Sequence, residues 1–168
     1  MRKLIILVFI LIIIIFLMYF FKIYINYGTP SLPRGIYIMI NKTPELNDIA
    51  VACIPDEVAR YGVNRGYIPK GICRNGSMPV MKKIFGLPGD SFEIKNGVLH
   101  KNSKIISNFP IFEFDSRGRA LKNFYNNKQI LNTNEHWLMS DYADNSWDSR
   151  YYGAIKISYL LKPLLILE

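Results

Sequence analysis

The stretch PVMKKIFGLPGDSFEIKNGVLHK, residues 79–101, has the pattern of successive β-strands joined by tight turns. Its first seven residues, 79–85, form a strand candidate that ends at the turn sequence Gly-Leu-Pro-Gly. Residues 92–95 and 98–101 flank Asn96-Gly97, which is the strongest short-range signal for a β-hairpin. The centre of the chain is therefore expected to be antiparallel β structure.

Further strand candidates lie on both sides of this stretch. Runs rich in β-branched and aromatic residues occupy residues 35–40, 48–54, 104–106, 136–139 and 153–159. The apolar tail, residues 159–167, is broken by Lys162 and Pro163, and it indicates a final strand or an edge that touches a membrane.

Helical and irregular segments are few. A helix is expected only around residues 55–61, where Asp56 and Glu57 stand in the first turn. The polar stretch 115–134 is expected to be the most mobile region. These patterns predict a mainly β domain, either a partly open barrel or folded sheets, carried by one N-terminal helix.

The N-terminus contains 18 consecutive apolar residues, Leu4 to Phe21. A helix of that length spans about 27 Å, close to the bilayer core of about 30 Å. Residues 23–25 can extend this span if Lys22 reaches the interface. A cleaved signal peptide is the alternative, but its apolar core is shorter and a small-residue cleavage site follows it. We expect a transmembrane anchor at residues 1–25 and a β-rich domain at residues 26–168.

Composition and charge exclude several classes. The 168 residues are 50% hydrophobic, which argues against disorder, and two cysteines argue against a disulfide-dense scaffold. The net charge is +8, but the basic residues are scattered, so nucleic acid is not an expected partner. A mildly basic surface suits the anionic headgroups of a lipid bilayer. The basic residues that flank the span favour a cytoplasmic N-terminus only weakly.

Metal and cofactor chemistry has no support in the sequence. His100 and His136 are far apart, and neither has a neighbouring ligand at metal spacing. No G-x-S-x-G motif marks a nucleophile elbow. We expect neither a metal nor a cofactor.

Two segments can carry nucleophilic chemistry. Ser31 lies between Pro30 and Pro33, which stiffen the backbone, so it is either a positioned nucleophile or part of a rigid linker. Lys82 and Lys83 point to opposite faces of a strand, so one of them meets apolar neighbours. A desolvated lysine loses its proton more readily and can act as a general base. The alternative is two exposed lysines on an edge strand.

A third segment, residues 140–153, reads SDYADNSWDSRYYG. Its Asp, Asn and Ser content is typical of a tight polar loop. Asp148 and Arg150 are close enough in sequence to form an ion pair that fixes the loop's shape.

In this order, the three segments resemble the motifs of the type I signal peptidases, the serine–lysine membrane proteases. Residues 82–90 are similar to the family's K-R-x-x-G-L-P-G-D box, with Lys83 in place of Arg. Residues 140–153 are similar to its G-D-N-x-x-x-S-x-D-S-R-x-x-G box, with Ser140 replacing Gly and Tyr142 replacing Asn. The residues that match this second box include Asp141, Ser146, Asp148 and Arg150.

The serine segment resembles one branch of the family. Thr29 to Tyr37 has the form T-x-S-x-P-x-G-x-Y, which is similar to the TraF-type conjugative transfer peptidases, and Cys53 and Cys73 agree with that branch. The branch implies maturation of a conjugative pilin or mating-channel component, by hydrolysis or by joining the pilin's ends into a ring. A general signal peptidase and a non-enzymatic scaffold of a secretion system remain alternatives.

The resemblance also implies roles for individual residues. Ser31 would be the nucleophile and neutral Lys82 its general base, with Ser146 orienting the Lys82 amine. The Thr29 hydroxyl and the Ser31 backbone N–H would stabilise the oxyanion. The expected supporting residues of the acidic loop are Asp141, Asp148 and Arg150.

The family topology implies a single-pass protein of the bacterial inner membrane, with a cytoplasmic N-terminus and a periplasmic catalytic domain. The expected partners are the bilayer and a signal-peptide-bearing preprotein or pilin precursor. The periplasm is oxidising, so it allows a disulfide between Cys53 and Cys73, although two cysteines alone do not establish one.

Overall fold

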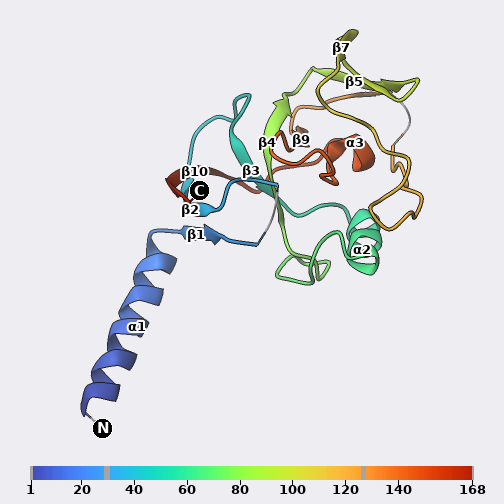
Figure 1. Cartoon of the computed structure of the whole chain (residues 1–168). Coiled ribbons are helices and arrows are strands. Elements are labelled where there is room, and N and C mark those ends of the chain that lie inside the picture. The colour runs from blue at the N-terminus through green and yellow to red at the C-terminus, as the bar shows by residue number, and fades with distance from the viewer. Residues whose placement is uncertain (1, 29–30, 126–127, 168) are drawn as a thin grey trace.

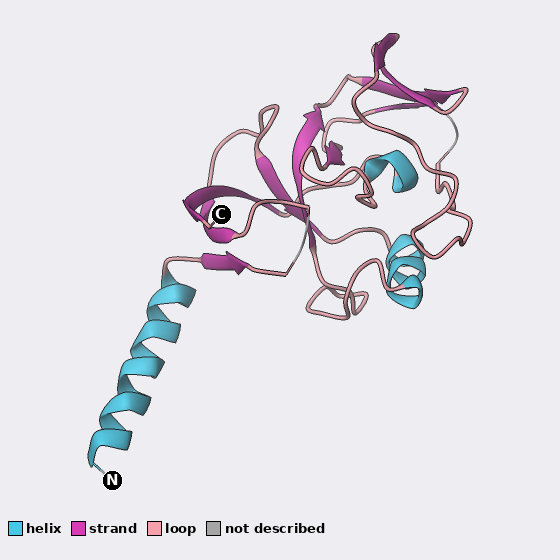
Figure 2. Ribbon diagram, viewed as in Figure 1, coloured by secondary structure: helices cyan, strands magenta, loops and turns pink. Residues whose placement is uncertain are grey.

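The computed structural model describes residues 2–28, 31–125 and 128–167. One long helix projects from a β-rich domain (Figure 1), and strands far outnumber helices within that domain (Figure 2). The elements are α1 (Arg2–Phe20), β1 (Ile23–Asn26), β2 (Gly35–Ile40), β3 (Ile49–Ala52), α2 (Asp56–Arg65), β4 (Val80–Gly86), β5 (Ser91–Lys95), β6 (Val98–Lys101), β7 (Lys104–Ile106), β8 (Lys128–Ile130), β9 (Trp137–Met139), α3 (Ser149–Tyr152) and β10 (Tyr159–Ile166).

The strands form two antiparallel sheets. The larger sheet has the order β1-β2-β10-β3-β4-β9, and the smaller has the order β7-β6-β5-β8. The predicted hairpin is present, because β5 and β6 pair from Phe92↔Lys101 to Lys95↔Val98. The mainly β fold with folded sheets is therefore confirmed.

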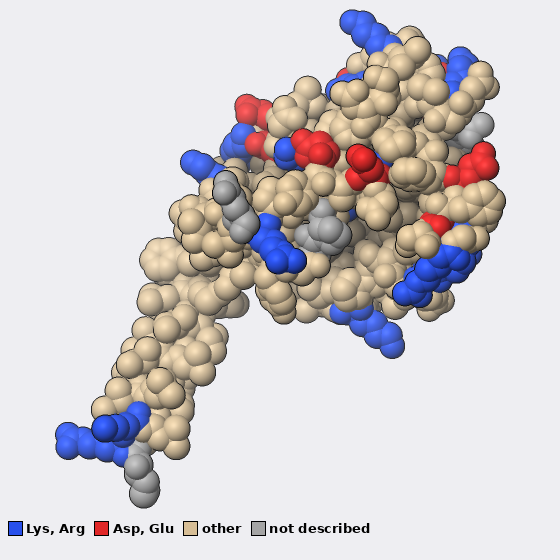
Figure 3. Space-filling model, viewed as in Figure 1, with Lys and Arg blue, Asp and Glu red and all other residues tan. Residues whose placement is uncertain are grey.

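The helix α1 has the length and composition of a membrane span, and none of its residues is buried. Figure 3 shows basic side chains at the N-terminal end of this helix and no charged side chains along the rest of it. In the same view, the basic side chains of the β domain are spread over its surface. These features agree with the predicted N-terminal anchor.

The expectation that residues 23–25 extend the span is wrong. The chain leaves α1 through a turn in which Lys22 adopts a φ of 50°, and residues 23–26 become β1. β1 pairs with β2 from Ile23↔Ile38 to Asn26↔Gly35. The backbone N–H and C=O groups of residues 23–26 bond to the edge of β2. In a longer helix the same groups would bond within the helix. The expected boundary after residue 25 therefore falls inside a strand of the β domain.

The C-terminal region also differs from the expected pattern. Residues 153–158 form no strand and contribute the bridge between Ile155 and His136, whereas Tyr159 already belongs to β10. The apolar tail instead forms β10, which confirms the final strand. β10 pairs with both β2 and β3 at Leu160 and Leu161, whereas from Lys162 onward it pairs with β2 alone. Pro163 is tolerated there because it lies next to an irregularity in the pairing with β2. This part of β10 also has a paired strand on one side only, so a missing N–H can face away from the sheet.

Three other elements depart from the sequence expectations. The helix α2 runs four residues beyond residue 61 and ends at Gly66, which takes the left-handed conformation of a C-cap. β8 lies within the polar stretch that was expected to be mobile, and it pairs with β5. The short helix α3 lies inside the segment predicted as a loop, and Asp148 caps its N-terminus.

The two sheets meet at an aromatic cluster. Phe92 of β5 stacks on Trp137 of β9 with ring centroids 4.3 Å apart and an interplanar angle of 2°. Both rings are fully buried, together with Leu99 of β6 and Met139 of β9. A second core lies between the larger sheet and α2. Its most buried members include Ala50, Ala52, Ile54, Ala59, Ile84 and Leu138.

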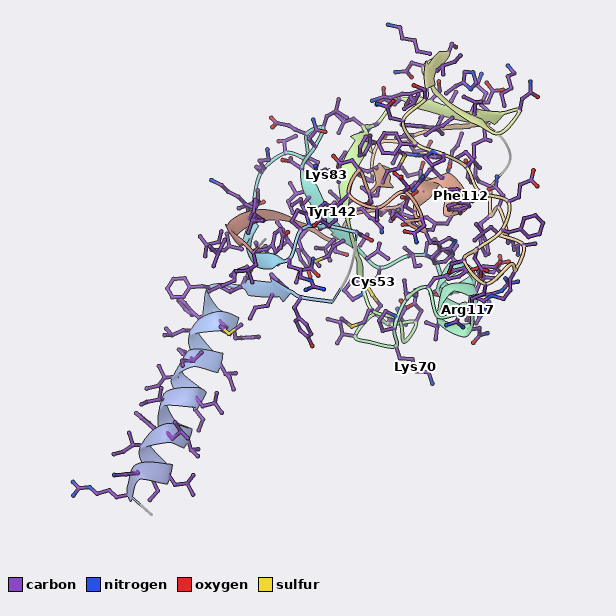
Figure 4. The ribbon with its side chains drawn as sticks, in the orientation of Figure 1. Cys53, Lys70, Lys83, Phe112, Arg117 and Tyr142 are labelled. Atoms are coloured by element: carbon purple, nitrogen blue, oxygen red, sulfur yellow. A yellow bond between two sulfur atoms is a disulfide. The ribbon has the colours of Figure 1, made fainter. Side chains whose placement is uncertain are left out.

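A disulfide joins Cys53, directly after β3, to Cys73 in the loop before β4, with their Cα atoms 5.8 Å apart. It is drawn as a yellow bond beside the Cys53 label in Figure 4. The bridge closes a segment that contains α2, and so it restricts the part of the chain that leads into β4.

Gly35 opens β2 at a point where the neighbouring strand comes very close. A Cβ at this position would overlap the backbone oxygen of Leu165 in β10. We expect Gly35→Ala to lower the free energy of unfolding by about 1–3 kcal/mol, because a strand backbone cannot move aside as a flexible side chain can. Urea unfolding of the solubilised chain measures this change. Gly28→Ala is the matched control, since a Cβ there meets nothing within 4 Å; equal losses in both variants would contradict the explanation.

Candidate active site

The site forms where the Ser31 loop, β4 and the segment after β9 meet. Burial alternates along β4, and the Lys82 side chain faces the interior with 5% of its surface exposed. The Lys82 Nζ donates a hydrogen bond to Ser31 Oγ and another, of 2.7 Å, to Ser146 Oγ. Ser31 itself is only partly buried, whereas the Lys82 amine that it contacts is buried. The structure thus brings together three residues that are 51 and 64 positions apart in sequence.

Burial has a direct effect on the Lys82 amine. Desolvation is the largest influence, and it lowers the pKa of Lys82 from 10.5 to about 8. The Asp148 carboxylate opposes this change, whereas the Arg150 guanidinium adds to it. A lysine with a pKa near 8 has a substantial neutral fraction close to neutral pH, so it can accept a proton from a neighbouring hydroxyl.

The loop that carries Ser31 is held by polar side chains from the strands on either side of it. The Asn26 amide, at the end of β1, donates to the carbonyl oxygens of Leu32 and Pro33 at 3.2 and 3.1 Å. The Tyr37 hydroxyl, on β2, donates to the Pro33 carbonyl at 2.6 Å. These bonds fix the backbone directly after the serine.

The segment that contains Ser146 is organised by a buried ion pair. Asp148 and Arg150 contact each other at 2.8 Å, and both side chains are fully buried. The Arg150 guanidinium also donates to the backbone carbonyls of Pro110, Asp144 and Ser146 at 2.8–3.2 Å. The predicted ion pair is therefore present, and it fixes the backbone on both sides of Ser146.

The remaining predicted site residues are Asp141 and Thr29. Asp141 forms an ion pair of 2.7 Å with Lys83, on the partly exposed side of β4. Figure 4 places Lys83 and the neighbouring Tyr142 close together over β4. Asp141 thus contacts Lys83, whose side chain lies on the opposite face of β4 from the Lys82 side chain. Thr29 lies outside the described residues.

Sequence reasoning missed three side chains that support this site. Asn26 was assigned no role, and Tyr37 was noted only as part of a motif. Ser140 was noted only as a departure from the family's glycine, yet its hydroxyl donates to the Ser31 carbonyl at 2.7 Å. The motif position of Tyr37, six residues after the serine, was the one available signal. Asn26 and Ser140 act through contacts that the sequence order does not indicate.

A hydroxyl, a buried lysine amine and a second hydroxyl in one hydrogen-bonded row are the parts of a nucleophile with its general base. The sequence matches the signal peptidase family, peptidase S26, over residues 1–162, and the chain belongs to this family. The resemblance noted in the sequence is therefore confirmed.

The plasmid transfer protein TraF of Escherichia coli is similar to this chain. The two are 30% identical over 141 residues, which cover 82% of this chain and 80% of that protein. The conjugal transfer protein TraF of Agrobacterium tumefaciens (strain 15955) is 28% identical over 136 residues, covering 79% and 75%. A crystal structure of a signal peptidase I from Enterococcus faecalis V583 aligns with a TM-score of 0.40 and 19% identity, covering 73% of this chain and 100% of that one.

Proposed function

We propose that this protein is a membrane-anchored serine endopeptidase that cleaves signal or leader sequences from exported proteins. The observation that carries the proposal is the buried Lys82 amine, which donates to both Ser31 and Ser146. A lysine that only served the fold would place its charge in solvent, as Lys83 does through its exposed pair with Asp141. Membership of a peptidase family supports the same activity.

The mechanism follows from the position of each group. Ser31 Oγ attacks the scissile carbonyl carbon while its proton passes to neutral Lys82 Nζ. The Thr29 hydroxyl and the Ser31 N–H are proposed to stabilise the oxyanion. The tetrahedral intermediate then breaks its C–N bond, and Lys82 returns the proton to the leaving amine. Water, deprotonated by Lys82, hydrolyses the acyl-enzyme and restores Ser31.

The TraF relatives support a role in conjugation. Their names describe plasmid and conjugal transfer proteins. We therefore propose that the substrate is a pilin precursor or another component of the mating channel. If the cut instead removes a C-terminal segment, the acyl-enzyme holds the pilin's new carboxyl end, and attack by the pilin's own amino terminus in place of water releases Ser31 and gives a ring.

The anchor supports a place at the inner membrane, with the N-terminus cytoplasmic and the β domain periplasmic. Ser31 follows Phe21 by 10 residues, which span at most about 36 Å even when fully extended. The C-terminal part of β10 pairs with β2, next to β1. It exposes the apolar side chains of Leu164, Leu165 and Ile166, and Leu167 directly after the strand is exposed too. Both features suit an active site close to the lipid surface, where a substrate's leader segment emerges.

Two other functions make different predictions. A general signal peptidase would process many preproteins, whereas a conjugative enzyme would process one or a few. A non-enzymatic scaffold of a secretion system would need neither Ser31 nor a buried lysine. The row of hydrogen bonds at Lys82 favours the enzyme.

The experiment that tests the proposal uses the full chain in detergent micelles or liposomes. Candidate pilin precursors are incubated with the wild type and with Ser31→Ala, and the products are identified by mass spectrometry. We expect cleavage by the wild type alone. A product lighter than the linear cleaved chain by one water indicates a ring. Full cleavage by Ser31→Ala would rule out the serine mechanism.

The activity is expected to rise with pH. Only neutral Lys82 accepts the proton, and its pKa of about 8 means that the active fraction grows as pH increases through 8. We expect kcat/KM at pH 7 to be about tenfold below its plateau, since each pH unit below the pKa lowers the neutral fraction about tenfold. A profile of kcat/KM from pH 6 to pH 10 measures the midpoint. An activity that falls over this range would contradict Lys82 as the base.

A further inference from the structure

One buried hydroxyl links the acidic loop to the backbone of the candidate nucleophile. Ser140, directly after β9, is 1% exposed, and its Oγ lies 2.7 Å from the carbonyl oxygen of Ser31. The two residues are 109 positions apart in sequence. The family's motif has glycine at this position, and glycine has no side chain that could make the contact.

The direction of this hydrogen bond is determined by the neighbouring groups. The backbone N–H groups of Tyr142 and Ala143 both donate to Ser140 Oγ, each at 3.2 Å. A carbonyl oxygen can only accept, and a hydroxyl has a single hydrogen to donate. The Ser140 hydrogen therefore points at the Ser31 carbonyl. The two incoming N–H groups polarise the hydroxyl and strengthen the bond that it donates.

Ser31 is thus held at two atoms, its side-chain oxygen by Lys82 on β4 and its carbonyl oxygen by Ser140 after β9. The Ser31 side chain accepts from Lys82, whose amine is also bonded to Ser146. The Ser31 carbonyl accepts from Ser140, whose own backbone N–H donates to the buried Asp148 carboxylate at 3.3 Å. Two fixed points define the direction of the Cα–Cβ bond, whereas a single point leaves it free to turn.

We infer that Ser140 is a positioning residue that aims the Ser31 hydroxyl at the scissile carbonyl. This inference rests on the proposed peptidase function and deepens it. Ser140 touches neither Lys82 nor the substrate in this role; it acts through the backbone of Ser31. Small errors in the placement of a reacting group lower the rate strongly, so the effect belongs in kcat.

The kinetic test compares Ser140→Ala, Ser140→Thr and a matched control in the full solubilised chain. Ser149→Ala is the control, because Ser149 is also fully buried and its hydroxyl accepts a bond from the Leu138 N–H of β9. We expect Ser140→Ala to lower kcat about tenfold with little change in KM, as the loss of one hydrogen bond would. Ser140→Thr keeps the hydroxyl and should restore most of this loss.

Two readouts separate positioning from a structural role. Ser149→Ala should lower the Tm at least as much as Ser140→Ala does while kcat stays near the wild-type value. The midpoint of the pH profile should remain near 8 in Ser140→Ala, because Lys82 keeps its surroundings. An unchanged kcat in Ser140→Ala, or a midpoint of its pH profile that moves away from the wild-type value, would overturn the inference.

A second measurement tests the contact without any activity. Ser31-Leu32 is the one Ser-Leu pair in the sequence, so ¹³C-carbonyl serine combined with ¹⁵N-leucine gives a single carbonyl–amide NMR correlation, from Ser31. We expect Ser140→Ala to move this carbonyl signal upfield and Ser140→Thr to leave it close to the wild type. An unmoved signal in Ser140→Ala would overturn the contact itself. A moved signal in a chain that cleaves no substrate would instead count against the proposed function.

Discussion

Replacing Lys82 with methionine is expected to abolish cleavage and to stabilise the protein at neutral pH. Methionine has a similar length but cannot take a proton, so we expect activity to fall by at least about 10³-fold, as when other nucleophile–base pairs lose a member. The folded protein also carries a cost at Lys82, because its pKa is lowered from 10.5 to about 8. Such a shift corresponds to about 3 kcal/mol at pH 7.

The pH dependence of this stabilisation follows from the direction of the pKa change. Below pH 8 the amine is charged in both the folded and the unfolded chain, and the folded chain bears the whole cost. Between pH 8 and pH 10.5 only the unfolded chain keeps the proton, so the wild type becomes more stable as pH rises. The advantage of Lys82→Met should therefore be largest below pH 8 and vanish near pH 10.5. Urea unfolding at pH 7 and pH 10 measures it.

Lys83→Met is the matched control for both effects. Lys83 neighbours Lys82 on β4 but points to the other face, where it pairs with Asp141 on a partly exposed surface. We expect the variant to keep its activity and to change the free energy of unfolding by less than about 1 kcal/mol. Loss of activity in Lys83→Met together with retention in Lys82→Met would show that the other lysine is the base.

Arg150→Met is expected to cause the largest loss of stability in the β domain. The substitution leaves the Asp148 carboxylate charged and without its partner in a site with no exposed surface. It also removes the donors to the carbonyls of Pro110, Asp144 and Ser146. Breaking a buried pair in this way costs about 3–5 kcal/mol. We expect that loss in urea unfolding, and a loss of activity as well, because Ser146 is no longer held.

Exposed ion pairs of Lys42 provide the control for the loss of stability expected in Arg150→Met. Lys42 contacts Glu45 at 2.8 Å and Asp48 at 2.9 Å on the surface of the domain. We expect Lys42→Met to lower the free energy of unfolding far less than Arg150→Met does, because solvent screens these charges and replaces the lost contacts. If Arg150→Met cost no more than Lys42→Met, the buried pair would not be what holds the acidic loop in place.

Local patterns in the sequence predicted most of the β structure, and they predicted that Lys82 and Lys83 lie on opposite faces of one strand. The hairpin at Asn96-Gly97 and the alternation along β4 depend on neighbouring residues, so a single sequence contains them. The order of the strands cannot be predicted from neighbouring residues. β10 lies between β2 and β3, and both of these strands are more than 100 residues away in the sequence. β1 was missed for a related reason: residues 23–25 are apolar, and apolar residues suit a membrane helix as well as a strand.

The motifs identified Ser31, Lys82 and Ser146, but not the groups that hold them in place. Asn26 and Ser140 bond to backbone carbonyls, and almost any residue can supply a carbonyl, so no side-chain pattern marks the partner. Such contacts become visible only when the coordinates of both segments are known. Thr29 lies outside the described residues, and its role in the oxyanion site stays a prediction.

The place of β10 in the larger sheet has a consequence for the order in which the protein is made. β10 separates β2 from β3, so the sheet cannot close until this late segment has left the ribosome. The Ser31 loop leads into β2, which lies on one side of β10. Lys82 is on β4, which lies on the other side of β10, beyond β3. Pairings between distant parts of a chain also form late in folding. The two halves of the site therefore meet only after β10 has been made, and a chain that stops before β10 lacks the assembled pair.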